Sequence, residues 1–144
     1  MTTAAHIRLV LWKAAKAIEK VDRASIAGTG LQLSEFTIME VLKHKGPLAI
    51  TAIGDKVLLT SGSMTAAINR LERKGYVRRR RDANDGRRYH VQLTEVGKAI
   101  IDKAYARHAA NLERVAEALN PTERATLVRL LKTIGRRAEA LDVA

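Results

Sequence analysis

Apolar residues near the start of the chain recur every three or four positions, which is the period of an amphipathic helix. The pattern predicts a helix over residues 5–24, with apolar positions at Ile7, Val10, Leu11, Ala14, Ile18 and Val21. A loop is expected at residues 28–30, which read Gly-Thr-Gly. A second helix is predicted after this loop, because Ser34 is a good N-cap and Gly46-Pro47 is a stop signal.

Two short helices joined by a tight turn are predicted in the middle of the chain. Residues 48–50 are too few for a helix and predict a short strand. Thr51 is placed to cap the first short helix. Thr60 or Ser61 is placed to cap the second, which Gly75 ends at its C′ position. This order resembles a helix-turn-helix.

Beyond Gly75 the period of the apolar residues changes from that of a helix to that of a strand. Tyr89, Val91 and Leu93 alternate with polar residues, and residues 82–86 are rich in turn formers. Together these features predict a β-hairpin with one apolar face.

A long helix is predicted from its cap at Thr94 to Leu119, and Asn120-Pro121 restarts the chain in a last helix. The apolar stripe of the long helix has the 4-3-4-3-4 spacing of a seam that packs against another helix. It consists of Ile101, Tyr105, His108, Leu112, Val115 and Leu119. We expect a compact module at residues 33–93, flanked by helical regions at residues 1–27 and 94–144 whose seam suits dimerisation. The alternative is that the long helix packs only on its own chain's last helix.

Composition narrows the class of protein. The 144 residues are 47% hydrophobic but only 3% aromatic, so the core must be aliphatic, which suits packed helices. The net charge of +11 favours a polyanionic partner, with nucleic acid ahead of a membrane surface. The absence of cysteine excludes disulfides and thiol chemistry. With no signal peptide or transmembrane run in the sequence, we expect a soluble, cytoplasmic protein without a membrane partner.

The second helix of the pair has the surface that a DNA-reading helix needs. At about 100° per residue, Met64, Ile68 and Leu71 face the core. The opposite face is small and polar at its start and basic at its end, which suits entry into the major groove. The candidate contacts are Ser61, Ser63, Thr65, Ala66, Asn69, Arg70 and Arg73. An ordinary solvated surface helix would also explain this pattern.

The hairpin carries an unusual charge. Residues 70–88 hold nine arginines or lysines and three acids, a local net charge of +6. DNA phosphates would neutralise this self-repulsion, and a wing beside the helix would reach the minor groove. The candidate wing contacts are Arg79, Arg81, Asp85, Arg87 and Arg88, with Asp85 expected to hold the Arg87 guanidinium. The alternative is a solvated basic strand.

The sequence offers few residues suited to metal binding or catalysis. His6, His44, His90 and His108 share no short ligand spacing, and no nucleophile with a base appears, so we expect no metal, no cofactor and no enzymatic activity. Trp12, Phe36 and Met39 suggest a ligand pocket between the first helix and the DNA-binding module, although the same residues suit an ordinary core.

The segment from Ser61 to Gly97 resembles the signature of MarR-family transcriptional regulators. The matching elements are Leu-Glu-Arg-Lys-Gly-Tyr-Val at 71–77, Asp-Gly-Arg at 85–87 and Leu-Thr-Glu-Val-Gly at 93–97, and residues 33–42 also fit. The resemblance implies a mainly α fold with a small β-hairpin wing: a winged helix-turn-helix with long N- and C-terminal dimerisation helices. It also implies Arg87 as the minor-groove arginine of the wing, oriented by Asp85.

The function expected from this resemblance is that of a homodimeric repressor on a pseudo-palindromic operator in double-stranded DNA. Residues 53–72 also resemble a branch that responds to quinones and other aromatic compounds. Since the chain lacks the cysteine that several relatives use to sense oxidants, a small aromatic effector is the expected trigger. The alternative is a DNA-binding protein without small-molecule input, either a constitutive repressor or an architectural protein.

Overall fold

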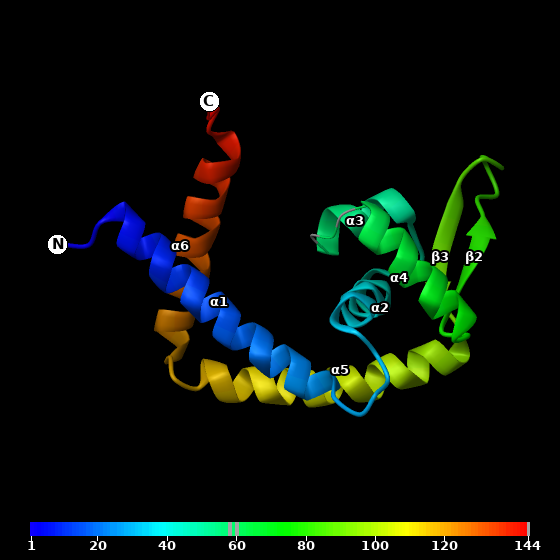
Figure 1. Ribbon diagram of the computed structural model, residues 1–144, viewed down its shortest axis with the longest axis horizontal. Helices are drawn as coiled ribbons and strands as arrows, with labels where there is room; N and C mark the ends of the chain where they lie inside the picture. Colours follow the sequence, from blue (N-terminus) through cyan, green and yellow to red (C-terminus); the bar gives the residue numbers. More distant parts are fainter. Residues whose placement is uncertain (58, 60, 144) are drawn as a thin grey trace. The chain divides into compact units, whose positions relative to one another are not determined.

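The computed structural model describes residues 1–57, 59 and 61–143, apart from the side chain of Ser61. Its elements are α1 (Ala4–Ile26), α2 (Leu33–Lys45), β1 (Leu48–Ala49), α3 (Ile50–Val57), α4 (Ser61–Arg73), β2 (Val77–Arg81), β3 (Tyr89–Leu93), α5 (Glu95–Ala116) and α6 (Pro121–Ala140). The fold is mainly helical with one small antiparallel sheet, as predicted (Figure 1). None of the described helices is apolar and long enough to cross a bilayer.

The chain forms two compact units, residues 1–109 and residues 110–144. The first contains the helix-turn-helix, the sheet and most of α5, and the second contains the end of α5 together with α6. The domain boundaries drawn from the sequence, at 27, 33 and 94, stay a prediction.

The sheet has the strand order β1-β3-β2, with both neighbouring pairs antiparallel. Val77 lies opposite Leu93 in the hairpin, and Leu48 lies opposite Val91. The predicted short strand is therefore confirmed, and its partner is the second strand of the wing. It is shorter than predicted, because Ile50 already begins α3. Thr51 consequently lies inside that helix and is not its cap.

The start of α2 also differs from the prediction. The helix begins at Leu33 with Gln32 as its N-cap residue, so Ser34 lies inside the first turn. The carboxylate of Glu35 accepts a hydrogen bond from the Gln32 backbone N–H over 2.8 Å. An acidic side chain at the third helical position can satisfy this donor, so Glu35, and not Ser34, caps the start of the helix.

Gly75 ends α4 as predicted. Its φ of 77° is in the left-handed region that glycine adopts without strain. The Tyr76 N–H donates to the Leu71 carbonyl over 3.0 Å, and the Gly75 N–H donates to the Glu72 carbonyl over 3.0 Å. This hydrogen-bond pattern closes the helix and directs the chain into β2.

The core lies within the first unit and is aliphatic apart from one large ring. Its fully buried side chains include Phe36, Ile38, Met39, Ile53, Ile68, Leu71, Val77, Val91 and Ile101. The first half of the α5 stripe belongs to this core, because the His108 ring stands edge-on to Phe36 at 4.9 Å. That half of the predicted seam therefore packs within its own chain. The helix α5 ends at Ala116, before the predicted end at Leu119.

Thr94 caps α5 as predicted and also joins the helix to the wing. Its hydroxyl accepts from the Gly97 N–H over 3.0 Å and donates to the Gly75 carbonyl over 2.6 Å. Gly97 lies so close to the backbone that a Cβ there would be 1.9 Å from the Tyr76 carbonyl oxygen. Only glycine fits this crossing without moving the backbone.

Two helices display rows of apolar side chains to solvent. Those of α1 are Ile7, Leu9, Val10, Leu11, Trp12 and Ile18, and those of α6 are Leu127, Val128, Leu130, Leu131 and Ile134. The N-cap of α6 is Asn120 with Glu123 and Pro121, as predicted. Exposed rows at helical spacing are typical of surfaces that another chain covers.

Candidate nucleic-acid interface

The outward face of α4 contains most of the residues expected there. Met64, Ile68 and Leu71 are buried, whereas Ser63, Thr65, Ala66, Asn69 and Arg73 are exposed. The side chain of Ser61, and Thr60 as an expected cap, lie outside the described residues. Ala67 is fully buried and packs in the core. The exposed face has short side chains at its start and Arg73 at its end, which suits a groove-reading helix.

Arg70 is the exception on this face. Its side chain is only 28% exposed, and its Nε lies 3.8 Å from the Glu35 carboxylate. Its Nη2 donates to the Ser34 hydroxyl over 3.3 Å. The guanidinium is therefore directed at α2, and its expected role as a DNA contact stays a prediction.

The wing lies beside α4, as Figure 1 shows, and Arg79 joins the two. The Arg79 guanidinium donates to the Asn69 side-chain oxygen over 2.7 Å. Arg81 donates from Nε to the Tyr89 hydroxyl over 3.2 Å, while Arg87 and Arg88 are exposed at the tip. Of the four candidate wing arginines, Arg79 and Arg81 are thus held by neighbours, and Arg87 and Arg88 extend into solvent.

The turn of the wing is organised by two carboxylates. Asp82 accepts from the Asn84 N–H over 2.8 Å, and this hydrogen bond lowers the pKa of Asp82. Asp85 accepts from the Arg87 backbone N–H over 3.0 Å. The guanidinium nearest to the Asp85 carboxylate is that of Arg88, at 4.0 Å. Asp85 therefore orders Arg87 through its backbone, and not through its guanidinium as expected.

Sequence reasoning missed a buried ionic cluster behind α4. Glu35 is fully buried, and Lys74 donates to its two carboxylate oxygens over 2.8 and 3.0 Å. Lys74 also donates to the Gly30 carbonyl over 3.0 Å. The available signal was a carboxylate in the first turn of a helix directly before buried Phe36. Its cationic partners lie 35 and 39 positions later, beyond the reach of a local pattern.

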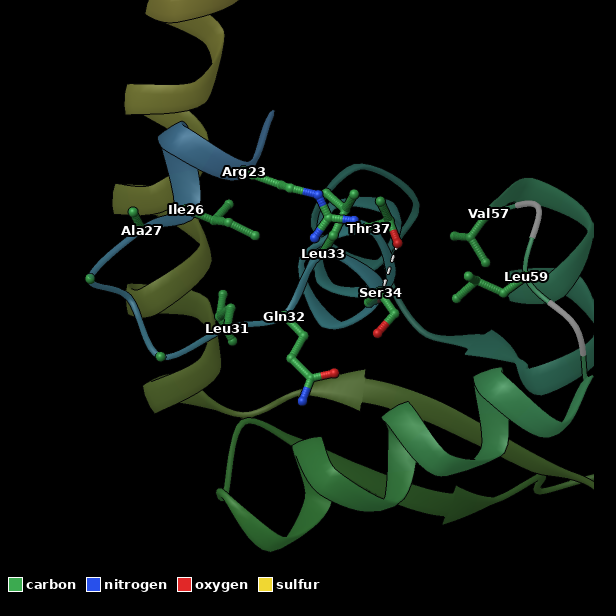
Figure 2. A pocket seen from close by; sticks show the side chains of 12 residues that line it. Arg23, Ile26, Ala27, Leu31, Gln32, Leu33, Ser34, Thr37, Val57 and Leu59 are labelled. Atoms are coloured by element: carbon green, nitrogen blue, oxygen red, sulfur yellow. Dashed lines mark hydrogen bonds between the residues drawn. The ribbon is translucent and has the colours of Figure 1, made fainter. Parts of the chain in front are cut away.

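A cleft of about 830 Å³ opens between the end of α1, the start of α2 and the end of α3. In Figure 2, the side chains of Arg23 and Ile26 of α1 extend toward α2, whose Leu33, Ser34 and Thr37 also line the cleft. Its remaining lining residues are Ala27, Gly28, Gly30, Leu31, Gln32, Val57 and Leu59. The walls are largely apolar, and Arg23 supplies one cationic group.

The predicted pocket residues do not line this cleft. Phe36 and Met39 lie in the core, at 1% and 0% exposure, while Trp12 is 53% exposed on α1. A pocket built from these three residues stays a prediction.

Two of the histidines each lie near one carboxylate. Nε2 of His108 lies 3.7 Å from Asp22, and Nε2 of His90 lies 3.5 Å from Asp82. Among the described residues, no group of three side chains is arranged to hold a metal ion.

Comparison with known proteins identifies a matching family and relatives of similar sequence. A model of the MarR family matches residues 31–89. The uncharacterized HTH-type transcriptional regulator YkoM of Bacillus subtilis (strain 168) is 35% identical over 88% of this chain and 84% of its own. The HTH-type transcriptional regulator MhqR of the same organism is 33% identical over 91% of this chain and 90% of its own. These relatives are transcriptional regulators and not enzymes.

Solved structures share the fold over most of the chain. The crystal structure of NadR in complex with 4-hydroxyphenylacetate matches with a TM-score of 0.80 at 22% identity. The match covers 93% of this chain and 95% of NadR.

Proposed function

The chain belongs to the MarR family of DNA-binding transcriptional regulators, and from this premise we propose that it is a homodimeric repressor released from its operator by a small aromatic ligand. The observation that carries the proposal is the arrangement of α4 beside the wing. The exposed face of α4, on which most side chains are short, lies beside a hairpin whose tip carries the exposed Arg87 and Arg88. A helix of this shape enters the major groove, and arginine at the tip suits the adjacent minor groove.

The apolar rows of α1 and α6 support dimerisation. Leu130 is 50% exposed and Trp12 is 53% exposed. The free energy falls when a second copy covers such apolar side chains and removes them from water. A twofold dimer carries two recognition helices, and these read half-sites about one helical turn apart. The operator is therefore expected to be a pseudo-palindrome.

The cleft beside α2 is the proposed effector site. Its apolar walls suit an aromatic ring, and Arg23 can pair with a carboxylate or phenolate on that ring. The complex of NadR with 4-hydroxyphenylacetate is an example of such a ligand in a protein of this fold. A ligand that binds better to a DNA-incompetent arrangement would lower operator affinity by population shift.

Selection of bound duplexes from a random DNA pool tests this proposal. We expect an enriched pseudo-palindrome, bound by a dimer, and a steep fall of affinity with salt. Titration of hydroxylated aromatic acids and quinones into the complex should then release the DNA.

The outcome also separates the alternatives. Sharp sequence preference with no response to any aromatic compound indicates a constitutive repressor. Similar affinity for all duplexes indicates an architectural protein. Activation of a reporter gene from the selected operator would contradict the repressor role.

A further inference from the structure

The buried cluster around Glu35 joins the end of α4 to the start of α2. Its carboxylate binds Lys74, which follows the last turn of α4, and lies close to Arg70 of that helix. It also accepts from the Gln32 N–H at the start of α2. A fully buried carboxylate with these partners fixes their positions, because separating the charges would leave Glu35 uncompensated in the interior.

The same cluster reaches the wall of the cleft. Lys74 donates to the Gly30 carbonyl, and Arg70 donates to the Ser34 hydroxyl. Gly30, Gln32 and Ser34 all line the cleft beside α2. Residues that hold the C-terminal half of α4 therefore also line the cleft.

The cluster also limits what Arg70 can do at DNA. Its Nε is buried without a hydrogen-bond partner among the described residues, and its Nη2 is engaged by Ser34. To reach a base edge, the guanidinium would have to leave Glu35. In this arrangement Arg70 holds α4 against α2. We therefore expect the exposed residues of α4 to contact the bases.

We propose that Glu35 is the positioning residue of the recognition helix and couples its sequence discrimination to occupancy of the cleft. This inference rests on the proposed function, because it presupposes specific DNA binding. Freed from Glu35, Lys74 and Arg70 become mobile cations beside the DNA surface. They then bind any phosphate, which raises the affinity for random DNA relative to the operator.

The first experiment compares Glu35→Gln with Asp102→Asn. The first change keeps side-chain volume and an acceptor for Gln32, and removes the charge that Lys74 and Arg70 share. The second makes the same chemical change in the partly exposed pair of Lys43 and Asp102, 2.6 Å apart, in the same unit. Both variants gain one unit of net charge, so their general attraction to DNA rises alike.

We expect the ratio of operator affinity to random-duplex affinity to fall about tenfold in Glu35→Gln and less than about twofold in Asp102→Asn. Urea unfolding of both variants confirms that binding is measured on folded protein. The double variant Glu35→Gln/Lys74→Met also removes one of the two freed cations, so its ratio should recover part of the loss. Equal ratios in Glu35→Gln and Asp102→Asn, or a ratio in the double variant no higher than that of Glu35→Gln, overturn the inference.

The second experiment fills the cleft covalently. The chain has no cysteine, so Thr37→Cys on the cleft wall is modified alone by N-phenylmaleimide. We expect the adduct to lower operator affinity about tenfold, and less than about threefold when Glu35→Gln is also present. The same reagent on Lys45→Cys, at the exposed far end of α2, controls for labelling. Equal losses with and without Glu35, or no loss at all, contradict the coupling.

Failure of the inference and failure of the proposed function give different results. A wild-type protein that discriminates among duplexes while Glu35→Gln behaves like Asp102→Asn overturns only the role of Glu35. A wild-type protein that binds no duplex overturns the proposed function, and the inference with it.

Discussion

The guanidinium of Arg79, on the first strand of the wing, donates to the side-chain oxygen of Asn69 on α4 over 2.7 Å. The bond connects the two elements proposed to contact DNA. It also sets the orientation of the Asn69 amide, whose nitrogen is left to donate to an acceptor on a base edge. An arginine expected to bind DNA directly therefore acts here on a neighbouring residue of the recognition helix.

This relationship predicts a loss of base preference in Arg79→Met. Without its partner the Asn69 amide can rotate, so discrimination at one base pair per half-site should fall by about 1–3 kcal/mol. Affinities for an operator series with single substitutions measure the effect. Arg80→Met is the matched control, because Arg80 is an exposed neighbour on the same strand. Its loss should weaken all duplexes alike, and a uniform loss in Arg79→Met would contradict the orienting role.

Arg87→Ala tests the wing tip. Removal of an exposed guanidinium from the minor groove should weaken operator binding, most at sites where that groove is narrow. It should also reduce the slope of log affinity against log salt by about one. Binding titrations at several salt concentrations check both effects. Lys45→Ala removes a cation from the exposed end of α2 and should leave the slope nearly unchanged.

Leu131→Glu tests the dimer. If a second copy covers the apolar row of α6, a charge there should weaken dimerisation by about 2 kcal/mol or more, the scale of an interface hot spot. Sedimentation equilibrium measures the dissociation constant. Val96→Glu makes a similar change at a 59% exposed position of α5 outside that row. A dimer equally stable in both variants would place the interface elsewhere.

Gly97→Ala tests the close approach of α5 to the wing. Its Cβ would lie 1.9 Å from the Tyr76 carbonyl oxygen, so the backbone must shift, and we expect a loss of about 1–3 kcal/mol in unfolding free energy. Gly135→Ala in α6 meets nothing within 4 Å and should be neutral or stabilising by up to about 1 kcal/mol. Denaturant unfolding at a fixed protein concentration compares the two, and equal stabilities would show that the crossing tolerates a methyl group.

The wing turn should respond to acid through Asp82. The hydrogen bond from the Asn84 N–H lowers the pKa of Asp82 below the ordinary aspartate value of 3.8. The folded pKa is depressed, so the stabilisation is present above the ordinary value and is lost as the pH falls through the lowered one. The amide resonance of Asn84 in ¹⁵N spectra should report this titration. Asp82→Asn should abolish it, and a midpoint above 3.8 would contradict the assignment.

Local rules predicted most of the fold. The apolar period located the helices and the hairpin, while Gly75, Thr94 and Asn120 marked their ends as the structure has them. Errors were confined to boundaries. Ser34 and Thr51 are good caps in isolation, but Glu35 satisfies the Gln32 N–H, and α3 begins at Ile50, directly after the short strand.

The sequence by itself determined the helical period, the caps, the basic hairpin and the small polar face of α4, because each depends on residues within one or two turns of one another. Only the tertiary structure decided which cations are held and which are exposed. Arg70 and Lys74 meet Glu35, and Arg79 meets Asn69, because packing brings separate elements within hydrogen-bond distance. Charge pairing depends on separation in space, and a linear pattern gives only separation along the chain.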